Sequence, residues 1–78
     1  MIALDNRIKD LREDSDLLQK DVASAIGITQ RKYSYIETGI QQATDEILCK
    51  LAIFYGTSVD YIVKLTDNAS PYERRRMK

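Results

Sequence analysis

The sequence has no histidine, one cysteine, one proline and three glycines in 78 residues. Without histidine, Cys49 lacks a partner for nucleophilic catalysis, and neither a phosphate-binding glycine loop nor a metal-ligand cluster is present. Acidic residues gather near the start of the chain without the spacing of a calcium-binding loop: Asp10, Glu13, Asp14 and Asp16. We therefore expect that the protein is not an enzyme and binds no metal or cofactor.

The scarcity of proline and glycine also leaves little room for a β architecture with many turns. The longest apolar run, Leu51 to Tyr55, is far too short to cross a bilayer. Charged residues at Asp5, Arg7 and Lys9 interrupt the N-terminal stretch before the apolar core of a signal peptide could form. With a single cysteine and no secretion signal, we expect a protein of the reducing cytoplasm without disulfides.

The stretch 18–39 predicts two short helices that meet at a tight corner. The first, 19–26, ends at Gly27, and the second, about 29–37, begins at a Thr29 cap. Their apolar residues recur at helical spacing and predict the buried side of the corner: Val22, Ala23, Ile26, Ile28, Tyr33 and Ile36. A helix, a short turn with a glycine and a second helix are the layout of a DNA-binding helix-turn-helix.

Three further segments predict helices, which makes the chain all-α. An amphipathic helix is expected from Leu4 to Asp14, a fourth helix after a Thr44 cap and a fifth after a Ser58 cap. The apolar faces of the last two helices are predicted to contain Ile47, Leu48, Leu51, Ala52, Phe54 and Tyr55, and then Val59, Tyr61, Ile62 and Leu65. We expect one compact five-helix domain, residues 1–68, and a basic tail, 69–78, that could begin a short frayed helix at Ser70–Pro71.

Charge is unevenly distributed although the formal net charge is zero. Residues 1–28 hold six acids and four bases, whereas 29–36 hold Arg31 and Lys32 and no acid. The tail after Pro71 holds four bases and Glu73. The chain is therefore polarised, and we expect few phosphates to be neutralised per chain, with weak non-specific affinity for nucleic acid and reliance on a dimer.

Several segments taken together resemble the phage repressor and Cro family, also called XRE-type regulators. The resemblance covers residues 4–67 and rests on Arg7–Arg12, Gln19–Ala23, Gly27–Gln30, Tyr33–Gly39, Ile47–Ala52 and Tyr55–Ile62. It implies a lambda-repressor-like domain that binds operator DNA, usually as a symmetric dimer, and acts as a transcriptional regulator, most often a repressor. The third helix would then enter the major groove of double-stranded DNA.

The resemblance also assigns roles to individual residues. Base contacts are implied for Gln30, Arg31 and Tyr35, and backbone contacts for Gln19, Thr29, Lys32 and Gln41. Glutamine suits adenine and arginine suits guanine; for Tyr35 both a thymine methyl and a phosphate are open, and for Gln41 both the backbone and a base. Arg12 and Glu37 match a pair that bridges the first and third helices in this family.

The sequence leads to two further expectations, a homodimer and an alternative function. The resemblance places a homodimer contact at the fifth helix, with Tyr61, Leu65 and the tail as candidates. The alternative is an antitoxin-like or adaptor module that keeps the fold with little DNA binding. Zero net charge and a loop without Lys or Arg, Ile40–Ala43, favour the alternative, whereas the surface formed by Gln30, Arg31 and Lys32 opposes it.

Overall fold

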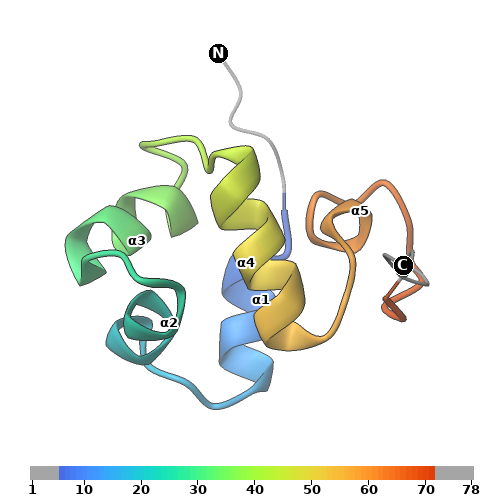
Figure 1. Cartoon of the computed structure of the whole chain (residues 1–78), viewed down its shortest axis with the longest axis horizontal. Coiled ribbons are helices and arrows are strands. Elements are labelled where there is room, and N and C mark those ends of the chain that lie inside the picture. Colours follow the sequence, from blue (N-terminus) through green and yellow to red (C-terminus); the bar gives the residue numbers. More distant parts are fainter. Residues whose placement is uncertain (1–5, 72–78) are drawn as a thin grey trace, which may run out of the picture.

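The computed structural model describes residues 6–71, and every regular element in that range is a helix. The elements follow in the order α1 (Ile8–Asp14), α2 (Gln19–Ile26), α3 (Gln30–Glu37), α4 (Asp45–Tyr55) and α5 (Val59–Ile62). In Figure 1, α4 stands in the middle with α1 behind it, α2 and α3 on one side and α5 on the other. The prediction of an all-α, five-helix fold is confirmed.

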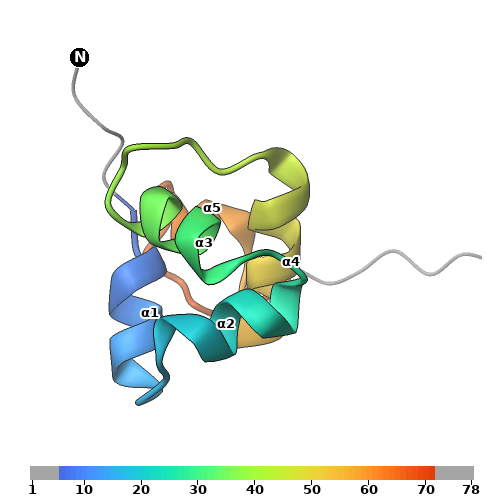
Figure 2. The ribbon, with the colours of Figure 1, turned by 90° about the vertical axis from the view of Figure 1, so that its left-hand side faces the viewer.

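The helices α3 and α5 lie at opposite sides of the molecule. When the molecule is turned by a quarter, α3 comes to the front above α2, and α5 lies behind it (Figure 2). The loop after α3 passes over the top of the fold and leads into α4 (Figure 2). No helix within residues 6–71 combines the length and the apolar character that crossing a membrane requires.

The core draws a residue from every helix and includes both sides of the predicted corner. Val22, Tyr33 and Ile62 are completely buried. Its remaining buried members are Ile8, Ala23, Ile26, Ile36, Ile47, Leu51 and Ala52, and partly buried Ile28 packs against this cluster. The predicted interior of the helix-turn-helix is therefore confirmed, including Tyr33 as a core residue rather than a surface contact.

Side-chain caps begin three of the helices, as the sequence predicts. The hydroxyl oxygens of Thr29, Thr44 and Ser58 each accept a hydrogen bond from the backbone N–H three residues later, at 3.1, 3.2 and 3.1 Å. Each bond satisfies an N–H group that the first helical turn would otherwise leave without a partner. The Thr29 cap therefore sets the first residue of α3 as Gln30.

Four helices end in the same way: a residue with left-handed backbone conformation follows the helix, and the same two backbone hydrogen bonds form there. After α4, for example, Gly56 has φ 66°, its N–H donates to Ile53 and the next N–H donates to Ala52. These two hydrogen bonds end the helix, because they provide donors for its last carbonyl groups. The left-handed residues that follow α1, α2, α4 and α5 are, in order, Asp16, Gly27, Gly56 and Lys64; Gly39, after α3, is left-handed too.

Two of the predicted helix boundaries are wrong. The first helix begins at Ile8 rather than Leu4, because the backbone N–H of Arg7 donates to the carbonyl of Ile62 at 2.8 Å and the Asn6 side chain accepts from Ile8. Leu4 itself lies outside the described residues. The fifth helix ends at Ile62 because Lys64 turns the chain at φ 65°.

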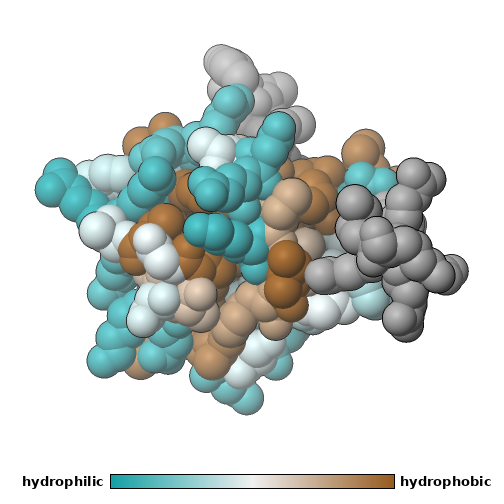
Figure 3. Space-filling model, viewed as in Figure 1, coloured by the Kyte–Doolittle hydropathy of each residue, from teal (hydrophilic) through white to brown (hydrophobic). Residues whose placement is uncertain are grey.

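Two residues expected on apolar, inward faces are exposed instead. Leu65 follows the left-handed turn and is 76% exposed, and Phe54 is 41% exposed on the outer side of α4. Hydrophobic side chains are visible across the face of the molecule in Figure 3. The Phe54 ring packs edge to face against the Tyr55 ring, with 4.9 Å between ring centroids.

Candidate nucleic-acid interface

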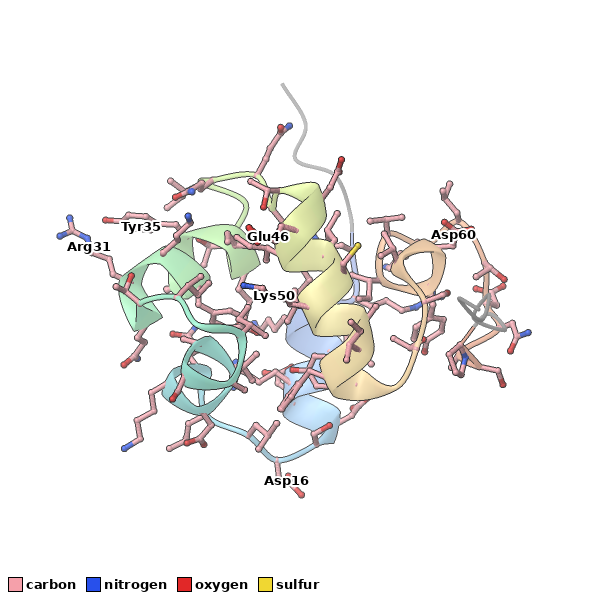
Figure 4. All side chains as sticks on the ribbon, viewed as in Figure 1. Asp16, Arg31, Tyr35, Glu46, Lys50 and Asp60 are labelled. Carbon is pink, nitrogen blue, oxygen red and sulfur yellow. The ribbon has the colours of Figure 1, made fainter. Side chains whose placement is uncertain are left out.

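The outer side of α3 presents polar side chains to solvent while its inner side is locked into the core. Gln30 and Arg31 are exposed and Lys32 and Tyr35 are partly exposed, whereas Tyr33 and Ile36 point inward and are buried. Arg31 and Tyr35 project away from the body of the protein at one edge (Figure 4). The same edge is predominantly hydrophilic in Figure 3.

Two expected contact residues outside α3 are attached to that helix by hydrogen bonds. Gln41 lies exposed in the following loop, and its backbone N–H donates to the carbonyl of Tyr35 at 3.1 Å. Gln19, the first residue of α2, donates from its amide to Glu37 at 3.3 Å. The structure thus gathers Gln19, α3 and Gln41, which the sequence separates, into one region.

A buried ion pair joins α1 to the last turn of α3. Arg12 donates from Nε and Nη2 to the two carboxylate oxygens of Glu37, both at 2.9 Å, and from Nη1 to the carbonyl of Leu17 at 2.9 Å. The side chains are 15% and 3% exposed. Because this bidentate geometry holds both partners in one orientation, the pair fixes α3 relative to α1.

The protonation of this pair follows from its hydrogen bonds. Burial by itself raises the pKa of Glu37, but the hydrogen bonds from Arg12 and Gln19, with the Tyr33 hydroxyl close by, outweigh it and hold that pKa below its ordinary value. The hydrogen bond to Glu37 likewise raises the pKa of Arg12. Both groups are therefore charged at neutral pH.

Two tyrosine hydroxyls beside the pair are buried, and among residues 6–71 neither has a hydrogen-bond partner of acceptable geometry: Tyr33 and Tyr55. Burial raises the pKa of Tyr55 to about 12 and raises that of Tyr33 as well, with the Glu37 carboxylate adding to both shifts. Nothing in the local sequence pattern marks Tyr55 as a neighbour of this cluster. It is brought there by the packing of α4 across the fold.

An alkaline titration will report on these buried hydroxyls. A folded-state pKa above the ordinary value near 10 means that folding opposes ionisation, so stability is complete below about pH 10 and declines as pH rises toward about 12. We expect tyrosinate absorbance to rise in two steps, with the late step reduced in Tyr55→Phe. A single step near pH 10 without loss of stability would contradict the burial of these groups.

The Thr29 cap provides a second test, of how α3 begins. We expect Thr29→Ala to lower the free energy of unfolding by about 1 kcal/mol, because the Lys32 N–H loses its partner. Urea denaturation measures the change. Ser24→Ala, at an exposed position inside α2, is the matched control and should leave the stability unchanged or slightly raised. Equal effects of the two substitutions would show that the cap does not stabilise α3.

Of the two residues expected at a dimer contact, Tyr61 lies in α5 and Leu65 follows that helix, and α5 itself lies on the side of the fold away from α3 (Figure 1). Leu65 is exposed, but the ring of Tyr61 is covered by the Arg7 guanidinium at 4.1 Å. Arg7 also donates to the carbonyls of Tyr61 and Thr66, at 2.7 and 2.9 Å, and to the Asp67 carboxylate at 2.8 Å. Sequence reasoning missed this role of Arg7, because the contacts join opposite ends of the chain.

The predicted helical tail lies outside the described residues from 72 onward.

Within the part of the chain that the structure describes, no three His, Cys, Asp or Glu side chains are arranged to hold a metal ion.

Comparison with known families agrees with this geometry. Residues 8–62 match a family model described as Helix-turn-helix, so the chain belongs to the helix-turn-helix family. The resemblance to phage repressors and XRE-type regulators is thereby confirmed.

Two curated relatives extend that assignment. The chain is 40% identical over 58 residues to the cryptic phage CTXphi transcriptional repressor RstR of Vibrio cholerae, a match that covers 74% of this chain and 52% of that protein. It is 36% identical over 73 residues to the uncharacterized HTH-type transcriptional regulator YobD of Bacillus subtilis (strain 168), covering 92% of this chain and 65% of YobD. The chain therefore spans less than two thirds of either relative. No solved structure matches it significantly.

Proposed function

We propose that the protein is a sequence-specific, double-stranded DNA-binding transcriptional regulator that acts as a repressor by placing α3 in the major groove. The observation that carries the proposal is the solvent-facing side of α3, where Gln30, Arg31 and Tyr35 project from a helix locked in place by buried Tyr33 and Ile36. The match of RstR, a transcriptional repressor, supports it.

The base-reading side of α3 has the donors and acceptors that the major groove requires. Gln30 would pair with adenine and Arg31 with guanine, each through two hydrogen bonds. Tyr35 lies one helical turn beyond Arg31 and so reaches the same groove. These residues would specify the sequence, whereas contacts to phosphates would fix the register of the helix.

Phosphate contacts are proposed for Thr29, Lys32, Gln41 and Gln19. Gln19 begins α2, where Leu18 has no side chain that can accept a hydrogen bond from the first helical N–H groups. The N–H of Asp21 donates to the Leu18 carbonyl, so the backbone N–H groups of Gln19 and Lys20, with the remaining amide hydrogen of Gln19, are those available to a phosphate oxygen. An apolar residue at this cap position costs stability in the free protein but leaves the helix end open for DNA.

A homodimer would place two copies of α3 on one face of the duplex. We propose that exposed Leu65, just after α5, and the exposed part of Tyr61 within α5 form its contact. Two-fold symmetry then requires a pseudo-palindromic site with half-sites about 34 Å apart, one turn of B-DNA. The basic tail, residues 69–78, adds positive charge to a domain that ends near residue 68.

Salt dependence tests the proposal directly. With about two to four phosphates neutralised per dimer, log affinity should fall with log salt at a slope of about −2 to −4. The measurement is fluorescence anisotropy of a duplex from the protein's own upstream region, over a series of salt concentrations. No binding at low salt would contradict the proposal.

A second candidate function is favoured by one observation. The exposed α3–α4 loop, from Ile40 to Gln42, has no basic residue, and the whole chain has zero net charge. An antitoxin-like or adaptor module that holds a protein partner would need no basic surface. The same titration separates the two functions, because such a module would show no salt-dependent binding to any duplex.

A further inference from the structure

Arg31 and Tyr35 are joined to each other on the solvent side of α3. The Nε–H of Arg31 donates to the Tyr35 hydroxyl at 2.9 Å, and its guanidinium carbon lies 5.5 Å from the centre of the Tyr35 ring. Residues four apart on a helix are neighbours, so their spacing permits this contact. Figure 4 shows both side chains extending outward from α3 and meeting at its edge.

The contact uses one donor of the guanidinium and leaves the others unengaged. Within residues 6–71, neither Nη1 nor Nη2 of Arg31 makes a hydrogen bond, and no carboxylate pairs with the side chain. A guanidinium has five N–H donors in a fixed plane. Fixing Nε therefore sets the plane and points the two terminal nitrogens away from the protein.

We propose that Tyr35 is a positioning residue, which holds Arg31 so that its two terminal nitrogens read one guanine in each half-site. The proposal rests on the proposed function and replaces a direct base contact of Tyr35 with an indirect role. Guanine presents two major-groove acceptors, N7 and O6, and two parallel donors of one guanidinium match them. Holding the long arginine side chain before binding removes rotamer freedom that the complex would otherwise have to lose.

The geometry of the Arg31–Tyr35 pair also predicts how guanine is distinguished from the other three bases. Cytosine offers a donor and thymine offers one acceptor and a methyl group, so neither satisfies both terminal nitrogens. Adenine retains N7 but replaces O6 by an amino group, which opposes the second donor. A guanidinium held in one plane cannot rotate to avoid that mismatch, so Tyr35 should sharpen the preference for guanine more than it raises affinity for all sequences.

The test uses the full chain and duplexes selected from a random library. The guanine in question is the position at which Arg31→Ala loses its base preference. Replacing that base by 7-deazaguanine removes N7, whereas inosine keeps both N7 and O6. We expect 7-deazaguanine to weaken the wild type but not Arg31→Ala, and inosine to leave the wild type unchanged.

Tyr35→Phe then removes the acceptor and keeps the ring. We expect the preference for guanine over adenine to fall about three- to tenfold, with an effect below twofold on scrambled duplex. In Arg31→Ala, the same change should have less than a twofold further effect, since the two residues act as a unit. Tyr55→Phe, which removes a buried hydroxyl on α4, is the matched control and should keep the wild-type preference.

Three results would overturn the proposal while leaving the proposed function intact. The first is an unchanged preference for guanine in Tyr35→Phe. The second is an equal loss of affinity on every sequence, which indicates a phosphate contact. The third is independent effects of the Arg31 and Tyr35 substitutions. If the wild type selects no sequence at all, the proposed function fails, and this proposal fails with it.

Discussion

Replacing Glu37 with alanine is expected to lower the free energy of unfolding by about 3–5 kcal/mol, the typical cost of removing one partner of a buried ion pair. The loss exceeds that of a surface pair because the Glu37 side chain is 3% exposed and its carboxylate accepts two hydrogen bonds from Arg12. Without it, Arg12 stays charged beside the core with one acceptor remaining, the carbonyl of Leu17. For a domain of this size, such a loss is a large fraction of the total stability.

Urea denaturation by circular dichroism measures the effect, and the chain offers a matched control. Glu46 forms an exposed pair with Lys50 at 3.9 Å, and Glu46→Ala should change the stability by less than about 0.5 kcal/mol. Replacing both members of the buried pair, Arg12→Met with Glu37→Leu, should recover part of the loss because no uncompensated charge is left. Equal effects of Glu37→Ala and Glu46→Ala would contradict the structural role of the pair.

The same pair predicts how stability depends on acid. The pKa of Glu37 is lower in the folded protein than in the unfolded chain. Its contribution is therefore present above the unfolded value, about 4.3, and is lost as pH falls through the folded value. As pH falls below the unfolded value, the difference in stability between wild type and Glu37→Ala should therefore narrow. A constant difference between them down to the lowest pH would contradict this assignment.

Removing the side chains that we propose to contact bases, Gln30 and Arg31, is expected to have the second largest effect. Gln30→Ala and Arg31→Ala should each cost about 1–3 kcal/mol on the preferred site, which is roughly a 5- to 150-fold loss of affinity. The reason is that each substitution removes two hydrogen bonds to one base edge. Both side chains are exposed, so the stability of the free protein should stay within about 0.5 kcal/mol of the wild type.

Comparison of duplexes separates base contacts from phosphate contacts. Gln30→Ala and Arg31→Ala should relax the preference at one position each and bind scrambled duplex almost as the wild type does. Lys32→Ala is the matched control: it should weaken binding to all sequences alike and make the salt slope shallower by about one per chain, which is about two per dimer. Equal losses on all duplexes for Arg31→Ala would assign that residue to the phosphate backbone.

The fold was largely predictable because local signals agree along the chain. Caps at Thr29, Thr44 and Ser58 and glycines after α2 and α4 place most helix ends within a residue. The two wrong helix boundaries occur where the contact that sets the boundary joins residues far apart in sequence, or where the residue that ends the helix is an unusual one for that position. The start of α1 depends on Arg7 meeting Ile62, far along the chain.

The end of α5 shows the other kind of error. Lys64 adopts a left-handed conformation that normally favours glycine, so the sequence suggests a helix continuing to Leu65. The N–H of Leu65 instead donates to Asp60 at 2.8 Å and closes the helix. Leu65 is therefore turned outward, which makes it available to a partner.

The candidate site could be predicted as a set of residues but not as a set of contacts. The position of α3 in the helix-turn-helix points to Gln30, Arg31 and Tyr35 from sequence alone. Their spacing contained the signal for the link between Arg31 and Tyr35, because residues four apart on a helix can meet. The Gln19–Glu37 and Gln41–Tyr35 contacts required the tertiary structure, since they join different elements.

Selection of bound duplexes from a random library is the most direct test of sequence-specific binding by α3, because it reports sequence preference, symmetry and spacing together. We predict an enriched pseudo-palindromic motif whose half-sites lie about one helical turn apart, and the loss of one guanine from each half-site when Arg31→Ala is used. Recovery of the starting library without enrichment, at low salt and with folded protein, would contradict it.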